Sequence, residues 1–135
     1  MGYETISMEI SSNPEYVSII RLTTSGIANK VGFSIEDIED IKVAVSEACT
    51  NAIKHSEDSK ITLMFTIIGN GLQIDIKDKG KGYDMQSIPK PNLNEPKESG
   101  LGLFIIDALM DDVEIKSEDN QGTSIKMTKY LGVGI

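Results

Sequence analysis

The chain has 135 residues, of which 39% are hydrophobic and 25% are charged. This composition is typical of a globular protein with its own core, and we expect a single domain over residues 1–135. The net charge of −8 argues against a nucleic-acid backbone as the partner and permits a partner protein with a basic surface.

No apolar run is long enough to cross a membrane, and no signal-peptide core is present. The single cysteine, Cys49, cannot form an internal disulfide. A cytoplasmic protein is therefore expected.

The first third of the chain predicts one strand and two helices. Residues 3–10 (YETISMEI) alternate apolar and polar side chains, as a half-buried strand does. Residues 13–15 (NPE) are typical of a helix start, and Gly32 can end that helix. The stretch SIED at 34–37 resembles a capping box, which predicts a second and longer helix through about residue 55.

The middle of the chain predicts a hairpin followed by a long loop. Residues 60–68 and 72–78 are strand-like and flank the turn GNG at 69–71. Residues 79–99 carry no periodicity and three prolines. A loop of that length inside a compact domain is uncommon and is usually a functional lid or a mobile insert.

The C-terminal part predicts a helix and two further strands. The apolar run LFIIDALM after Gly102 indicates a short buried helix, and residues 112–117 and 123–131 indicate strands. The resulting order is strand, two helices, two strands, lid, helix, two strands. It predicts an α+β fold, a two-layer α/β sandwich.

The second predicted helix carries an acid and an amide four residues apart. Glu47 and Asn51 lie about 40° apart on a helical wheel, so they point the same way. They fall roughly opposite an apolar face formed by Ile38, Val45, Cys49 and Ala52. One interpretation is an ordinary solvated surface. The other is a general base beside an amide that can bind Mg²⁺.

Three neighbours on the same helix also have two interpretations each. Lys54 and His55 can reach phosphate oxygens, or they can be favourable cations near a helix C-terminus. Cys49 lies on the apolar face, which favours a small buried core residue over a nucleophile.

Two glycine clusters follow strands or open helices. Asp78, Gly80 and Gly82 come at the end of the hairpin, where a carboxylate can accept a hydrogen bond from the N6 amine of adenine and the glycines permit a tight turn. A plain turn is the alternative. The second cluster opens a helix, where backbone N–H groups can bind phosphate, and a small hydroxyl begins the last strand. These residues are Ser99, Gly100, Leu101, Gly102, Leu103 and Thr123.

In this order the motifs resemble the GHKL ATPase superfamily, which has the Bergerat nucleotide-binding fold. SEACTNA (46–52) resembles its N box, DKGKG (78–82) its first glycine box and SGLGL (99–103) its second. Across nearly the whole chain, the sequence is similar to the anti-sigma-factor serine kinases of the RsbW type. The resemblance implies a mixed, mostly antiparallel sheet and a mobile ATP lid.

The resemblance also implies an activity and roles for the site residues. It implies ATP with Mg²⁺ as cofactors, adenine held by Asp78, the metal held by Asn51, and Glu47 as the general base. The protein substrate would be a serine of an anti-anti-sigma factor, and a homodimer would also capture an alternative sigma factor. The remaining ATP-binding residues would be Lys54, His55, Gly80, Gly82, Ser99, Gly100, Leu101, Gly102, Leu103 and Thr123.

One position departs from the pattern, and two other functions stay open. Some relatives carry an arginine just before the second glycine box, near the γ-phosphate, whereas Lys97 and Glu98 stand there in this chain. Lys97 is one candidate for that charge. The alternatives are an ATP-responsive anti-sigma binding module with little kinase turnover and the detached catalytic domain of a histidine kinase. Glu47, where histidine kinases usually place an amide, counts against the latter.

Overall fold

The computed structural model describes residues 3–55, 60–78, 98–118 and 122–132. Within these ranges, the side chains of residues 55, 98–100 and 117–118 lie outside the description. The elements in chain order are β1 (Glu4–Ser11), the 3₁₀ turn η1 (Pro14–Tyr16), α1 (Val17–Val31), α2 (Ile35–His55), β2 (Lys60–Ile68), β3 (Gly71–Asp78), α3 (Glu98–Leu109), β4 (Asp112–Glu118) and β5 (Gly122–Tyr130).

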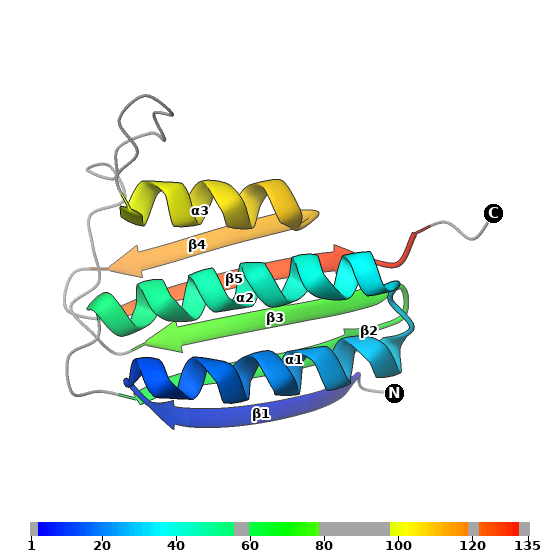
Figure 1. The fold of residues 1–135 in the computed structure, drawn as a ribbon, viewed down its shortest axis with the longest axis horizontal. Coiled ribbons are helices and arrows are strands. Elements are labelled where there is room, and N and C mark those ends of the chain that lie inside the picture. The colour runs from blue at the N-terminus through cyan, green and yellow to red at the C-terminus, as the bar shows by residue number, and fades with distance from the viewer. Residues whose placement is uncertain (1–2, 56–59, 79–97, 119–121, 133–135) are drawn as a thin grey trace.

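The described strands form one five-stranded sheet with the order β1-β2-β3-β5-β4. All three helices lie on one face of this sheet (Figure 1). The predicted two-layer α/β sandwich is therefore confirmed. The four strand pairs are all antiparallel, so the described sheet contains no parallel pair of the kind that a mixed sheet would include.

The start of the first helix follows from its capping residues. The Asn13 side chain accepts a hydrogen bond from the Glu15 backbone N–H at 2.9 Å, as a helix-capping amide does. Pro14 then begins the 3₁₀ turn that leads into α1. At the other end, Gly32 adopts a left-handed φ of 108° and receives no steric penalty for it.

Helix α2 is the central helix of the molecule (Figure 1). Its first turn is capped by Ser34, whose Oγ accepts a hydrogen bond from the Asp37 N–H at 3.2 Å. Although α2 has 21 residues, neither it nor any other helix in the described ranges is apolar and long enough to cross a membrane.

The core lies between α2 and the inner face of the sheet. Alternate residues of the strands point toward the helices, as the period of a strand requires. The apolar face predicted for α2 is confirmed, since Ile38, Val45, Cys49 and Ala52 are all buried. They pack in one cluster with the buried strand residues Ile61, Leu63, Phe65, Leu72, Ile74, Ile76, Ile125 and Met127.

The start of α3 differs from the sequence prediction. The helix begins at Glu98 rather than after Gly102, so both glycines of the second cluster are helical. The prediction followed the apolar run after Gly102, whereas the glycine cluster itself indicated a helix start. Glycine costs about 1 kcal/mol relative to alanine inside a helix. In the structure, Gly102 lies within the helix at the point where α3 comes close to Glu47 of α2.

Cys49 is a core residue, as the sequence predicted. Its side chain is buried on α2, and burial raises the pKa of the Cys49 thiol to about 12. A thiol that stays protonated at neutral pH is a poor nucleophile.

We predict that Cys49 makes the protein less stable in alkaline solution. The unfolded chain loses the thiol proton near pH 9, whereas the folded chain keeps it until about pH 12. The contribution of the protonated Cys49 thiol to the free energy of unfolding is therefore complete below pH 9. It declines above pH 9 by about 1.4 kcal/mol per pH unit. Urea unfolding of the wild type at about pH 8 and about pH 10 measures this decline. Cys49→Ala should decline less, and equal declines would contradict the prediction.

Candidate functional site

The part of α2 that carries Glu47 and Asn51 lies next to α3. Asn51 is only 8% exposed and Glu47 is half-buried. An ideal Cβ placed on Gly102 of α3 would lie 3.2 Å from Oε2 of Glu47. The interpretation of this face as a simple solvated surface is therefore wrong for Asn51. A buried amide of this kind requires polar partners to offset its desolvation.

The ends of two neighbouring strands supply a second polar group. Asp78, the last residue of β3, pairs directly across the ladder with Thr123 near the start of β5. Both are buried, with exposed fractions of 6% and 5%. A carboxylate and a hydroxyl thus lie side by side on the inner face of the sheet.

These two polar groups lie at the same end of the molecule. The C-terminal end of α2, the end of β3 and the start of β5 point to one end of the sandwich, and α3 begins there as well (Figure 1). The fold therefore gathers residues that are separated by up to about seventy positions in the chain. Among the predicted site residues, the segments that reach this end contain Asn51, Asp78, Gly102 and Thr123.

Other predicted residues are less completely described. Lys54 lies on the exposed side of the last turn of α2, and Leu101 and Leu103 are half-buried in the first turns of α3. For His55, Ser99 and Gly100, the structure describes the helical backbone alone. Gly80, Gly82, Lys97 and most of the predicted lid, residues 79–97, lie outside the described residues.

A lysine that the sequence prediction missed binds the C-terminal end of α3. The half-buried Lys129 of β5 donates from Nζ to the backbone oxygen of Leu109 at 2.6 Å. Helix α3 has no basic residue in its own last turn, so this ammonium group supplies the charge that favours a helix C-terminus. The signal in the sequence is a lysine at an inward position of a strand, two residues after the buried Met127.

Contacts next to this lysine hold the same corner of the molecule. The Tyr130 N–H donates to Oδ2 of Asp111 at 2.7 Å, and the Tyr130 hydroxyl donates to Oδ2 of Asp112 at 2.9 Å. The hydrogen bond with Asp112 and its negative charge raise the pKa of Tyr130. The end of α3 is therefore tied to β5 by several groups.

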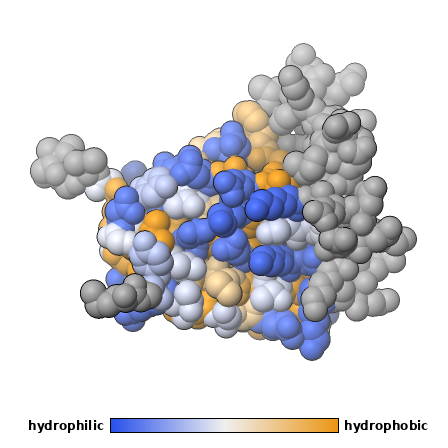
Figure 2. All heavy atoms as spheres, turned by 180° about the vertical axis from the view of Figure 1, so that it is seen from behind, coloured by the Kyte–Doolittle hydropathy of each residue, from blue (hydrophilic) through white to orange (hydrophobic). Residues whose placement is uncertain are grey.

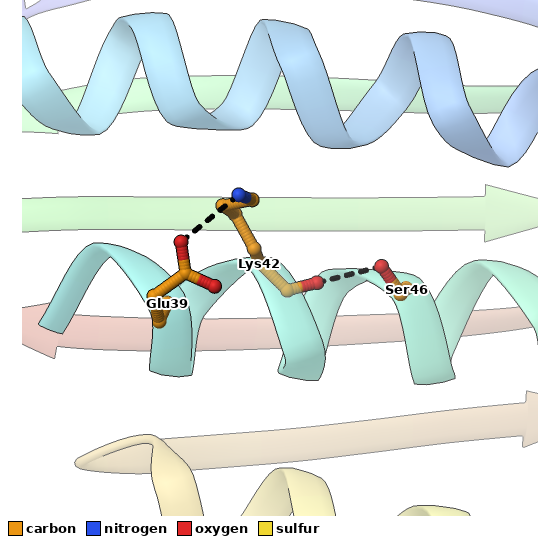
Figure 3. A network of polar contacts seen from close by, with 3 residues as sticks. All are labelled: Glu39, Lys42 and Ser46. Atoms are coloured by element: carbon orange, nitrogen blue, oxygen red, sulfur yellow. Dashed lines mark hydrogen bonds and ion pairs between the residues drawn. The ribbon is translucent and has the colours of Figure 1, made fainter. Parts of the chain in front are cut away.

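A separate polar network on α2 is local to that helix (Figure 3). Lys42 forms an ion pair with Glu39 at 3.0 Å, and the Ser46 hydroxyl donates to the Lys42 carbonyl oxygen at 2.7 Å. The ion pair joins residues of successive turns, and such pairs commonly stabilise a helix by a few tenths of a kcal/mol. The Ser46 hydroxyl satisfies its own donor on the backbone of the preceding turn. They involve neither Glu47 nor Asn51.

Comparison with known proteins places the fold in a class. The model of the family described as histidine kinase-like ATPase domain matches residues 10–129. A solved structure containing the RsbU and RsbW domains of Rv1364c from Mycobacterium tuberculosis aligns with a TM-score of 0.72 and 19% identity, over 95% of this chain and 32% of that longer chain. A histidine kinase domain from Erythrobacter litoralis aligns with a TM-score of 0.59 and 18% identity, over 97% and 64%. At such identities these two structures establish the fold.

More similar relatives narrow the class. A protein named serine-protein kinase RsbW from Oceanobacillus iheyensis is 43% identical, over 96% of this chain and 89% of the relative. The protein of the same name from Bacillus velezensis is 38% identical, over 93% and 85%. The chain therefore belongs to the histidine kinase-like ATPase domain family and, within it, to the RsbW serine-protein kinases.

Two glycine substitutions test the contact between the helices. Both Gly26 in α1 and Gly102 in α3 are helical, but a Cβ on Gly26 would meet nothing within 4 Å. We predict that Gly26→Ala raises the free energy of unfolding by about 1 kcal/mol, the usual gain in helix propensity. Gly102→Ala should gain less, because the Glu47 carboxylate must move. Urea unfolding measures both variants, and equal gains would contradict the close approach.

Proposed function

We propose that the protein is an ATP-dependent serine-protein kinase that also acts as an anti-sigma factor. The observation that carries the proposal is the placement of three buried polar residues, Asn51, Asp78 and Thr123, at the end of the sandwich where α3 begins (Figure 1). Gly102 of α3 also leaves little space beside the Glu47 carboxylate of α2. Membership of the RsbW family supports it. Its protein substrate would be a serine of an anti-anti-sigma factor.

The residues at this end of the sheet fit a purine nucleotide. In the proposed site, the Asp78 carboxylate accepts a hydrogen bond from the exocyclic amine of adenine, and Thr123 lies directly beside it. A carboxylate at this position is a strong acceptor for an amine donor. Backbone N–H groups in the first turn of α3 are suited to phosphate oxygens, because the positive end of the helix dipole lies there.

Asn51 is the proposed ligand of Mg²⁺. An amide oxygen is a hard ligand without charge, and Mg²⁺ in kinases commonly takes one or two protein ligands together with phosphate oxygens. Among the described residues, no group of three or more histidine, cysteine or acidic side chains could hold a metal by itself. When bound, the ion would neutralise charge on the transferred phosphate.

Glu47 is the proposed general base. Its carboxylate, half-buried one turn from Asn51, would accept the proton of the substrate serine hydroxyl as that oxygen attacks the γ-phosphate. Contact with Gly102 restricts where the carboxylate can lie. Because phosphoryl transfer depends mainly on positioning and charge stabilisation, a small displacement of this group should affect the rate.

The partners and the setting are part of the same proposal. An alternative sigma factor with a basic surface suits a chain of net charge −8. We further propose a homodimer, a cytoplasmic location, a single domain over residues 1–135 and Lys97 as the candidate cation near the γ-phosphate.

The second candidate function, an ATP-responsive anti-sigma module with little turnover, is favoured by Glu98, which stands close to where some relatives carry an arginine. Measuring phosphate added to the antagonist distinguishes the two.

The first test replaces the proposed base. We predict that Glu47→Gln lowers the rate of phosphate transfer to the antagonist serine by about 10²- to 10⁴-fold while ATP binding and sigma-factor capture persist. Glu39→Gln is the matched control, because Glu39 is an exposed residue of the same helix that pairs with Lys42. Mass spectrometry of the antagonist measures transfer. A normal rate in Glu47→Gln would remove Glu47 from the mechanism.

The second test concerns nucleotide recognition. We predict that Asp78→Asn weakens ATP binding by about 10- to 100-fold, which corresponds to loss of a charged hydrogen bond worth about 1.5–3 kcal/mol. Asp107→Asn makes the same chemical change on the exposed side of α3 and should retain the affinity. Calorimetry with ATP and millimolar magnesium measures both. Unchanged affinity in Asp78→Asn would contradict the adenine assignment.

A further inference from the structure

The face of the sheet that the helices leave uncovered contains a polar hollow. Its volume is about 280 Å³, close to the lower limit of small-molecule sites in proteins. Figure 2 shows this face from behind, where hydrophilic side chains gather over the strands among fewer apolar ones. The hollow is lined by six residues of three adjacent strands: Asp75, Lys77, Glu114, Lys116, Ser124 and Lys126.

The strand register arranges these six residues in two rows. In one row, Lys126 of β5 lies directly between Asp75 of β3 and Glu114 of β4. Asp75 and Glu114 are therefore both cross-strand neighbours of Lys126, and their negative charges offset its positive charge.

The second row contains two lysines and no acid. Ser124 of β5 lies directly between Lys77 of β3 and Lys116 of β4. Two ammonium groups thus flank one hydroxyl, with no acid in the row. Both lysines are exposed and Ser124 is half-buried.

The lysines around the hollow are not engaged with other described side chains. No ion pair joins Lys77, Lys116 or Lys126 to an acid within the described part of the chain. On the same sheet, the exposed Lys60 does pair with Glu9, at 3.2 Å. The ammonium groups of Lys77 and Lys116, which have no acid beside them in their row, are therefore available to a ligand, although the protein as a whole is strongly acidic.

We propose that this hollow binds the phosphate group of a small anion. Lys77 and Lys116 would each donate a charge-assisted hydrogen bond to the phosphate oxygens, and the Ser124 hydroxyl would donate a third. Asp75 and Glu114, in the next row, would accept hydrogen bonds from hydroxyl groups of the ligand. The set as a whole therefore suits either free phosphate or a hydroxyl-bearing phosphate monoester.

The hollow lies behind the proposed nucleotide site and does not overlap it. Lys77 precedes Asp78 and Ser124 follows Thr123, so the two pairs are successive rungs of one ladder. Since side chains alternate along a strand, the first pair faces the hollow and the second faces the helices. The proposal does not depend on the proposed kinase activity.

The test is an NMR titration of the full chain with inorganic phosphate at constant ionic strength. We expect saturable shifts of the backbone amides of Lys77, Lys116 and Ser124. The double variant Lys77→Gln/Lys116→Gln should weaken the affinity about tenfold, because it removes two ion pairs. The matched control Lys30→Gln/Lys60→Gln makes the same charge change at two exposed lysines elsewhere and should bind as the wild type does.

Two further measurements test the role of Ser124 and identify the ligand. Ser124→Ala removes one hydroxyl without changing charge and should weaken binding by a few fold. Glycerol 3-phosphate that binds more tightly than phosphate would indicate a hydroxyl-bearing monoester, whereas equal binding would indicate free phosphate. Equal affinities in the two double variants, or shifts confined to α2 and α3, would overturn the proposal.

Discussion

The close approach of α3 to α2 is the constraint on which the proposed site depends. A helix that covers a sheet normally leaves its opposite side to water, and polar residues there need no partner. Here α3 lies alongside α2, and Gly102 leaves room for the Glu47 carboxylate where any other residue would place a Cβ. The acid is therefore confined without being buried completely.

The position of α3 depends in turn on the sheet. Lys129 reaches from β5 to the last turn of α3, and the Asp111 and Asp112 carboxylates bind the neighbouring Tyr130. An ammonium group at a helix C-terminus satisfies carbonyl oxygens that have no partner within the helix. The helix that begins at the second glycine box is thus held at its far end by the same strand that carries Thr123.

The β3–β5 ladder organises both faces of the molecule. Its antiparallel register sets Asp78 beside Thr123 on the helical side and Lys77 beside Ser124 on the open side. A shift of one residue would exchange these faces, since side chains alternate with a period of two. Burial of Ile74, Ile76, Ile125 and Met127 in the core makes such a shift costly, so the apolar residues of the ladder also fix the polar ones.

The sequence by itself determined the elements, the fold class and the identity of the motifs, because hydrophobic period and capping residues are local signals. It predicted the capping roles of Asn13 and Ser34 and the apolar face of α2. Only the tertiary structure decided that Asn51 is buried, that α3 begins at Glu98, and that Lys129 caps α3 from β5. Each of these features depends on a contact between elements far apart in the chain. Local periodicity does not indicate which element will cover a given face of a helix or sheet.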